Sequence, residues 1–241
     1  DASNKVAYGE RRRYFVDGVL DSCMNYPFRT AILRFMQGKD DGRGVENAVM
    51  TILENYPKQV SLCNMNLLGT HDTMRILTAL VDDTERSRED AAKHHLTNEQ
   101  LVLAKERLQV ATFLQFMLPG CPSIYYGDEA GMEGGKDPFN RRTYPWGKEN
   151  QILLRHFRCL AGLRQEESAL RLGDIQFHQA VNNQISFTRT YKGQSIRVYV
   201  NRGSDDWEIP VGRVLLARNM LTVAPDQLVL GHNGFCILED A

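Results

Sequence analysis

The chain lacks a long apolar run, an excess of one charge and a paired-cysteine motif. No hydrophobic segment approaches the roughly 20 residues of a membrane span, so we expect no membrane partner. Lys and Arg number 29 against 30 Asp and Glu, which leaves no basic footprint for nucleic acid. The five cysteines are scattered, which predicts free thiols, no zinc site and a reducing, cytoplasmic setting.

What the sequence does contain is an alternation of short strands, polar turns and helices. Strands are predicted at 21–26, 62–68 and 121–127, and helices at 27–38, 45–56, from 73, at 98–117 and at 150–166. Thr97 and Gln100 fit a capping box at the start of the longest helix. The highly charged segment 82–95 is predicted to be a loop with a solvated helical turn. This alternation is typical of a parallel sheet or part of a (β/α) barrel.

From about Gly173 the pattern changes to apolar residues at every second position, with turns at Asn182-Asn183 and Lys192-Gly193. Period-two alternation over this length predicts a small antiparallel β-sandwich. The predicted fold class is therefore α/β followed by all-β. We place the domain boundary between 1–170 and 171–241.

The strongest candidate for chemistry is the pair His71-Asp72, which follows the apolar run beginning at Val60. A carboxylate at the carboxyl end of a buried strand can bind a hydroxyl group, act as a base or stabilise a cationic transition state. An alternative of equal weight is that Asp72 caps a helix that starts at Thr73. The two interpretations are compatible.

Two further stretches carry residues suited to sugar binding. Tyr125 to Glu129 brings two aromatic rings and two carboxylates to a strand end, where they could also serve only in packing and ion pairs. Asp137 to Trp146 holds an Arg pair that could anchor a carboxylate, or could fix the loop internally. The adjacent His94 and His95 lack ligand-type neighbours, so we reject a metal site there.

Taken together, these stretches resemble the α-amylase family of glycoside hydrolases, in its cyclomaltodextrinase and neopullulanase-like branch. The resemblance rests on motifs that occur in order along the first 146 residues. They are Asn25-Tyr26-Pro27-Phe28, the run from Asn66 to Arg75, the run from Gly120 to Met132, and the run from Gly134 to Arg142.

The resemblance implies a (β/α)8 TIM barrel followed by a β-sandwich, of which this chain would hold about strands 6 to 8 and the C-terminal domain. Asp72 would stabilise the oxocarbenium-like transition state. Roles in binding an α-glucan or maltooligosaccharide are implied for His71, Asn66, Arg75, Tyr26, Asp137, Arg141 and Arg142. No cofactor is expected, because nothing in this sequence supports the calcium that the family resemblance allows.

The retaining mechanism of this family also needs a nucleophile and a general acid, and their motifs would lie before Asp1. We therefore expect a C-terminal fragment that cleaves no α-1,4 or α-1,6 glucosidic bond alone. The unpaired strand edges of a partial barrel are expected to pair with the missing N-terminal barrel half or with a second copy of this chain. Two alternatives remain: a non-catalytic carbohydrate-binding or regulatory module, and a truncated gene product whose fold is a remnant.

Overall fold

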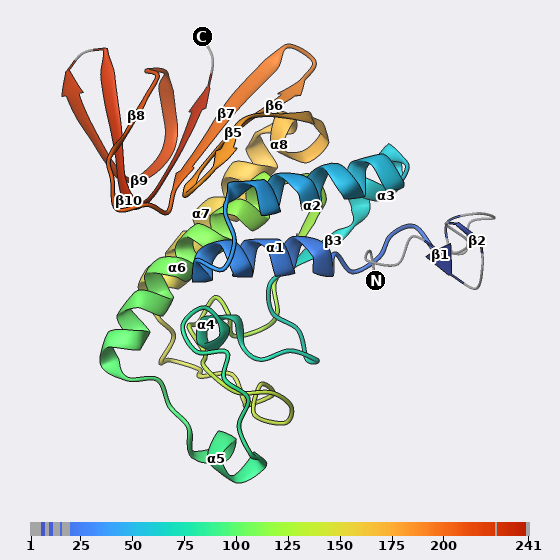
Figure 1. Ribbon diagram of the computed structural model, residues 1–241, viewed down its shortest axis with the longest axis vertical. Helices are drawn as coiled ribbons and strands as arrows, with labels where there is room; N and C mark the ends of the chain where they lie inside the picture. The colour runs from blue at the N-terminus through green and yellow to red at the C-terminus, as the bar shows by residue number, and fades with distance from the viewer. Residues whose placement is uncertain (1–5, 8–9, 12–14, 16–19, 225, 240–241) are drawn as a thin grey trace.

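The computed structural model describes all residues except 1–5, 8–9, 12–14, 16–19, 225 and 240–241, and it shows a helical part beside a curled sheet (Figure 1). The helices are α1 (Tyr26–Gln37), α2 (Gly42–Asn55), α3 (Lys58–Cys63), α4 (Ile76–Ala79), α5 (Arg88–Lys93), α6 (Asn98–Met117), α7 (Gln151–Glu166) and α8 (Ser168–Leu172). The strands are β1 (Val6–Ala7), β2 (Glu10–Arg11), β3 (Met65–Leu67), β4 (Cys121–Ser123), β5 (Asp174–Val181), β6 (Gln184–Tyr191), β7 (Gln194–Asn201), β8 (Trp207–Ile209), β9 (Arg213–Ala224) and β10 (Gln227–Glu239).

Among the described residues, the helical part contains two parallel strands and, before them in the chain, one isolated parallel bridge. β3 pairs with β4, with Asn66 opposite Pro122, and Met24 forms an isolated parallel bridge to Met65. Helices follow each of these segments along the chain. This is the repeating unit of a β/α barrel, and it directs the ends of β3 and β4 to one side.

These strands are shorter than the sequence predicts, and the apolar run from Val60 is only partly a strand. Its first residues belong to α3, where the N–H of Ser61 bonds to the Pro57 carbonyl at 2.9 Å and that of Asn64 to the Val60 carbonyl at 2.9 Å. Only Met65–Leu67 has partner strands. Periodicity does not distinguish a short buried helix from a strand, which explains the wrong prediction for residues 62–64.

The longest helix, α6, runs through the middle of the molecule. It begins with the predicted capping box, in which Thr97 and Gln100 bond reciprocally. From Val110 to Leu118 every residue is buried, because α1, α7 and β10 all contact this helix. This second half of α6 is therefore part of the core.

Two buried arginines cap the carboxyl end of α6. Arg164 donates to the carbonyls of Phe116 and Gly120, and Arg189 donates to the Met117 carbonyl at 2.5 Å. The last carbonyls of a helix have no partner within it, and the helix dipole favours a cation at this end. The arginines, which come from α7 and β6, therefore attach both elements to α6.

The C-terminal strands form one antiparallel sheet with the order β5-β6-β7-β10-β8, and β9 pairs with β10 on its other side. β10 changes partner along its length, pairing with β8 over Leu228–Leu230 and with β7 over Gly234–Glu239. The sheet curls at this change. Its two faces pack into different clusters: Val198 and Val200 face the main core, while Tyr199 faces a small second cluster.

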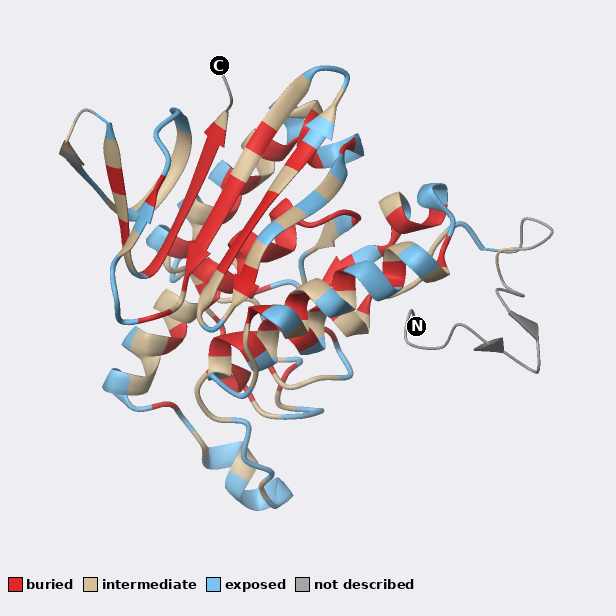
Figure 2. Ribbon diagram, turned by 45° about the horizontal axis from the view of Figure 1, so that its top comes forward, coloured by how far each residue is buried: buried red, intermediate tan, exposed pale blue. Residues whose placement is uncertain are grey.

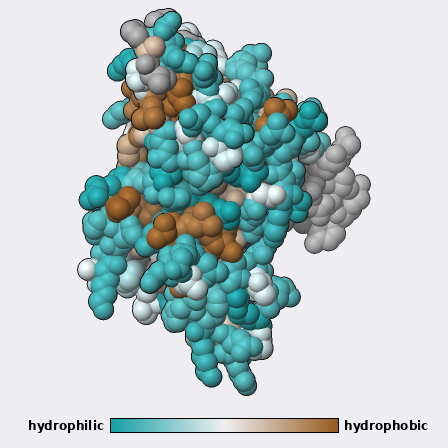
Figure 3. Space-filling model, turned by 60° about the vertical axis from the view of Figure 1, so that its left-hand side comes forward, coloured by the Kyte–Doolittle hydropathy of each residue, from teal (hydrophilic) through white to brown (hydrophobic). Residues whose placement is uncertain are grey.

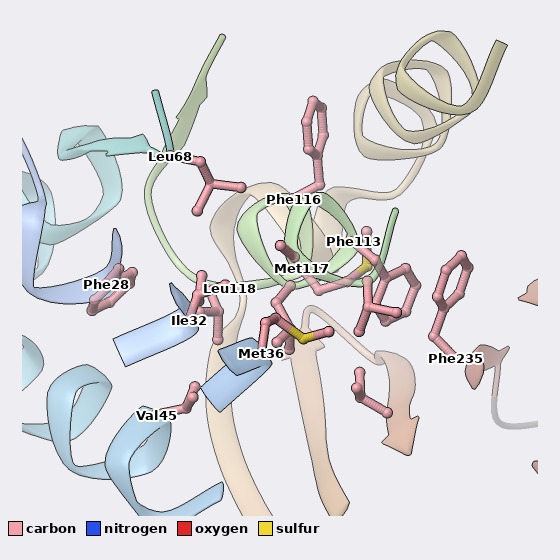
Figure 4. Packing of buried hydrophobic residues seen from close by; sticks show 14 of the residues in the cluster. Phe28, Ile32, Met36, Val45, Leu68, Phe113, Phe116, Met117, Leu118 and Phe235 are labelled. Carbon is pink, nitrogen blue, oxygen red and sulfur yellow. The ribbon is translucent and has the colours of Figure 1, made fainter. Parts of the chain in front are cut away.

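One hydrophobic core joins the helices to the sheet. In Figure 4, Phe113 of α6 lies against Phe235 of β10, with ring centroids 4.2 Å apart and planes at 16°. Buried residues run along the central strands of the sheet, whereas α5 has none (Figure 2). Because the core crosses residue 170, the division into two domains at that point stays a prediction.

The surface carries scattered hydrophobic residues. Figure 3 shows a brown band across the middle of one face and a second brown area near the top of the same view. The exposed large hydrophobic residues of α6 and α7 are Val102 and Ile152. Among the residues that the structure describes, no helix has the length and apolar character needed to cross a membrane.

Candidate active site

The His71-Asp72 pair lies on an exposed turn at the carboxyl end of β3. The His71 Nε2 atom is 3.2 Å from the Asp72 Oδ1 atom, and the two side chains are 55% and 62% exposed. The alternative that Asp72 caps the next helix is wrong, because α4 begins at Ile76 and has no side-chain cap. The carboxylate of Asp72 is therefore available to a ligand.

Three side chains hold this turn in place. The Thr70 hydroxyl accepts from the Asp72 N–H at 3.2 Å and lies 3.3 Å from the Tyr26 hydroxyl. The fully buried Asn140 donates to the carbonyls of His71 at 2.8 Å and Thr73 at 2.7 Å. These bonds fix the backbone on both sides of Asp72.

Sequence reasoning assigned no role to Asn140. It lies within the stretch from Asp137 to Trp146, but an asparagine in a loop carries no signal of burial. Its contact with the turn spans 69 residues of chain. Only the folded chain brings the two loops together.

Arg75 is buried completely, with 0% of its side chain exposed. Its guanidinium lies 3.3 Å from the Asp128 carboxylate, donates to the Tyr126 carbonyl, and sits 4.4 Å and 4.7 Å from the ring centroids of Tyr125 and Tyr126. Both hydrogen bonds come from the Nη1 atom, while the buried Nε and Nη2 atoms of Arg75 have no hydrogen-bond partner among the described residues. Because its side chain is enclosed, the predicted part of Arg75 in sugar binding would act through the residues that it positions.

Asp128, left open by the sequence, belongs to this buried network. Burial raises the pKa of its carboxyl group to about 7, although the Arg75 guanidinium opposes that shift. A Cβ atom at Gly69 would lie 2.1 Å from the Asp128 Oδ2 atom. Glycine at position 69 therefore lets the β4 loop approach the strand end that precedes His71.

Asn66 is also enclosed, with 2% exposure. Its amide oxygen accepts from Asn25 at 3.0 Å, and its amide nitrogen donates to the Pro119 carbonyl at 2.8 Å. Gln115 donates to the carbonyls of Asn66 and Ser123. The side-chain amides of Asn66 and Gln115 therefore link β3 to β4. Because Asn66 is enclosed, its predicted role in substrate binding stays a prediction and would be indirect.

The remaining predicted residues lie on the loop after β4. Arg141 pairs with Asp137 across 2.9 Å, and both side chains are about half exposed. Arg142 is half-buried, and its carbonyl accepts from the Tyr126 hydroxyl at 2.8 Å. The structure thus brings together two groups: Tyr26, His71 and Asp72 on the strand side, and Asp137 with Arg141 on the loop. Asn140 connects them.

Metal-ligating side chains and thiols are the other groups that could carry chemistry. Within the described ranges, no three His, Cys, Asp or Glu side chains gather closely enough to hold a metal ion, and the expectation that the protein needs no cofactor stays a prediction. His94 and His95 each contact a carboxylate instead, Asp82 and Glu133 respectively. The five cysteines are free; Cys236 is buried, but Cys63, Cys121 and Cys159 are exposed.

Comparison with known proteins places these features in context. Residues 5–152 match the family described as alpha amylase, catalytic domain. The chain is 37% identical over 228 residues to an amylopullulanase of Thermoanaerobacterium thermosulfurigenes, covering 84% of this chain and 12% of that protein. It is 35% identical over 197 residues to a cyclomaltodextrinase of Geobacillus thermopakistaniensis, covering 79% and 30%.

Solved structures agree. The Nostoc punctiforme debranching enzyme, soaked with acarbose, superposes with a TM-score of 0.75 at 26% identity, over 94% of this chain and 48% of that one. The type III pullulan hydrolase of Thermococcus kodakarensis gives a TM-score of 0.73 at 26% identity, over 96% and 37%. The chain spans less than half the length of each of these relatives, and the predicted fold class is confirmed.

Proposed function

Because the chain belongs to the α-amylase family of glycoside hydrolases, we propose that its His71-Asp72 turn forms part of the active site of a retaining enzyme. The proposed substrates are α-glucans and maltooligosaccharides, cleaved at α-1,4 or α-1,6 glucosidic bonds. The observation that carries this proposal is the exposed Asp72 carboxylate, held by Thr70 and Asn140 at the end of a parallel strand. Ligand sites of barrel folds lie at this end.

In the proposed reaction Asp72 is the carboxylate that stabilises the transition state. A carboxylate close to the anomeric carbon offsets the positive charge that develops there, and its oxygens accept from sugar hydroxyls. The neighbouring imidazole of His71 donates to a further hydroxyl. Retention also requires a nucleophile and a general acid with carboxyl groups about 5–5.5 Å apart. We assign neither role to a residue of this sequence.

This proposal predicts that the purified 241-residue chain binds maltoheptaose but releases no reducing sugar from it. Calorimetric titration should show binding that Asp72→Ala weakens by about tenfold or more. Asp206→Ala, which changes an exposed carboxylate in the β8 turn region, is the matched control and should bind normally. Release of reducing sugar at rates near those of an intact hydrolase would contradict the proposal, as would unchanged binding by the Asp72 variant.

We also propose that the strand edges of the helical part pair with further barrel strands, supplied by an N-terminal barrel half. Parallel sheets in proteins are covered on both faces, yet Met65 of β3 and Ile124 after β4 are 40% and 42% exposed. Sedimentation of the isolated chain tests the alternative partner, because pairing with a second copy would give a dimer. A cytoplasmic setting belongs to the same proposal and is supported by the free thiols.

A second candidate function is a non-catalytic carbohydrate-binding or regulatory module. It is favoured by the same exposed turn, because His71 and Asp72 can bind a sugar hydroxyl even where the nucleophile and the general acid are missing. The sequence of the reading frame upstream discriminates between the candidates. An Asp at a fourth-strand motif and a Glu shortly before position 1 would support the enzyme, and their absence would support the module.

A further inference from the structure

A carboxylate that the proposed reaction does not use lies against the segment that carries the His71-Asp72 turn. Asp128, in the loop after β4, is 3% exposed, and it pairs with Arg75, three residues after Asp72. Burying an ionised carboxylate is unfavourable unless it is paired and hydrogen-bonded. The position of Asp128 beside the turn therefore calls for a physical account.

The Asp128 carboxylate contacts the chain on both sides of the turn. On one side, a Cβ atom at Gly69 would lie 2.1 Å from the Asp128 Oδ2 atom, so the carboxylate rests on the backbone of Gly69. On the other side, its Oδ1 atom accepts from the Arg75 guanidinium at 3.3 Å. Residues 70–74 therefore lie between two contacts of one carboxylate.

Arg75 depends on this carboxylate for its charge balance. Among the described residues, Asp128 is its one carboxylate partner, and the Nε and Nη2 atoms of Arg75 are buried without a hydrogen-bond partner. Removing one partner of a buried ion pair is strongly unfavourable, because the other charge stays enclosed and uncompensated. Protonation of Asp128 would therefore release Arg75 from the position that it holds in the ion pair.

A second arginine connects the same carboxylate to the end of β3. Arg29 of α1 donates from its Nε atom to the Leu68 carbonyl at 2.8 Å. Burial lowers the pKa of the Arg29 guanidinium, and Tyr26 and Asp128 oppose that shift. The charge of Asp128 thus acts on two buried arginines, one bonded to the residue before Gly69 and the other at position 75.

The Asp128 carboxyl group changes its charge near neutral pH. Burial raises the pKa of this group to about 7; Arg75 and Arg29 oppose the shift, and Glu129 adds to it. The Glu129 carboxylate is itself engaged, because its Oε2 atom accepts from the Gly127 N–H at 2.8 Å. Asp128 is therefore mostly ionised at pH 8 and mostly protonated at pH 6.

From these contacts we infer that Asp128 is a positioning residue, which holds the His71-Asp72 turn for sugar binding only while its carboxyl group is ionised. This inference rests on the proposed function and adds a regulation of the same site. The ionised form pairs with Arg75 and keeps both ends of the segment 69–75 in place. The protonated form releases Arg75, the turn loses its support, and sugar binds more weakly.

The test is the affinity for maltoheptaose at pH 8 and pH 6, measured by calorimetry on the full chain and on Asp128→Asn. A competent form that is about 90% populated at pH 8 falls to about 10% at pH 6, so binding should weaken about tenfold. Asp128→Asn keeps the size of the side chain but has no charge to lose, so this tenfold change should disappear. Because histidines titrate in the same range, the two pH ratios are compared, and the His71 contribution cancels. Asp82→Asn is the matched control, since Asp82 is another enclosed carboxylate paired with an arginine, and it should keep the natural ratio.

A second readout is the NMR spectrum of the natural chain without sugar, which needs no variant at position 128. The Gly69 amide signal should shift with a midpoint near pH 7, because Asp128 lies against this residue. His71→Gln, which removes the imidazole of the turn, should keep that midpoint. The Thr84 N–H, which bonds to the Asp82 Oδ1 atom at 3.1 Å, should not shift between pH 6 and 8. Burial raises the pKa of Asp82, but the hydrogen bonds that its carboxylate accepts hold that pKa at about 2.

The outcomes separate this inference from the proposed function. If Asp72→Ala abolishes maltoheptaose binding while the natural chain and Asp128→Asn show the same pH ratio, the proposed function stands and the inference is overturned. A Gly69 amide without a midpoint between pH 6 and 8 overturns the inference as well. If the chain binds no maltoheptaose at pH 8, both the proposed function and the inference fall.

Discussion

Replacing His156 tests whether the contact between α6 and α7 makes the fold sensitive to acid. The His156 Nε2 atom lies 3.1 Å from the Gln109 carbonyl oxygen and 2.9 Å from the Thr112 hydroxyl. Burial lowers the pKa of the imidazole to about 4, against an ordinary value of 6.5. The ring is therefore neutral in the folded chain at pH 5, where the unfolded chain binds a proton.

The sign and size of the effect follow from this difference. The unfolded state binds more protons than the folded state between about pH 4 and 6.5, so the free energy of unfolding decreases as the pH falls through that range. At about 1.4 kcal/mol for each unit of pKa, the loss reaches about 2 kcal/mol at pH 5 and about 3 kcal/mol at pH 4. Well above pH 6.5 His156 is neutral in both states, and this loss of unfolding free energy is absent.

The assay is urea unfolding at pH 7.5, 6 and 5 of the natural chain and of His156→Gln, which keeps an amide donor for the Gln109 carbonyl. The variant should be less stable at pH 7.5, because packing is lost, but its stability should fall less with acid. The gap between the two proteins should therefore narrow by about 2 kcal/mol from pH 7.5 to pH 5. His178→Gln on the exposed side of β5 is the control and should keep the natural slope. Parallel pH profiles for the natural chain and His156→Gln would refute the reasoning.

Three further substitutions test the packing and the site. Phe113→Ala removes the ring stacked on Phe235 and should lower the free energy of unfolding by about 3–5 kcal/mol, measured by urea unfolding; a loss below about 1 kcal/mol would mean that this contact does not join helix to sheet. Gly42→Ala would place a Cβ atom 2.8 Å from the backbone of Ala180, and the overpacking should cost about 1–3 kcal/mol in the same assay. Asn140→Ala leaves two carbonyls of the active-site turn without their donor. Hydrogen exchange at residues 70–74 should therefore accelerate, and maltoheptaose binding should weaken. Unchanged exchange would contradict the conclusion that Asn140 holds the turn.

Some features could be predicted from the sequence because they depend on neighbours along the chain. The capping box of α6 requires only Thr97 and Gln100, three residues apart, and it is confirmed. The period-two alternation after Gly173 depends on each strand alone, and the antiparallel sheet is confirmed from β5 onward. Motif order along the first 146 residues indicated the family, and the family match over residues 5–152 confirms it.

The same local reasoning failed where a short segment has two conformations of similar energy. The apolar run at Val60 predicted a strand, but hydrogen bonds after Pro57 favour a helical turn until Asn64, where partner strands become available. The alternative that Asp72 caps a helix failed for a related reason. Contacts between its turn and Asn140, far away in sequence, hold the backbone in a turn, and α4 begins only at Ile76.

The sequence by itself determined which residue types stand at the strand ends, and so the candidate pair His71-Asp72 and the order of the elements. The tertiary structure alone decided which of these groups face solvent. Asp72 is exposed, whereas Arg75 and Asp128 are enclosed with each other. The physical reason is that burial is set by contacts between residues far apart in the chain, 53 residues for this ion pair, and no local pattern encodes them.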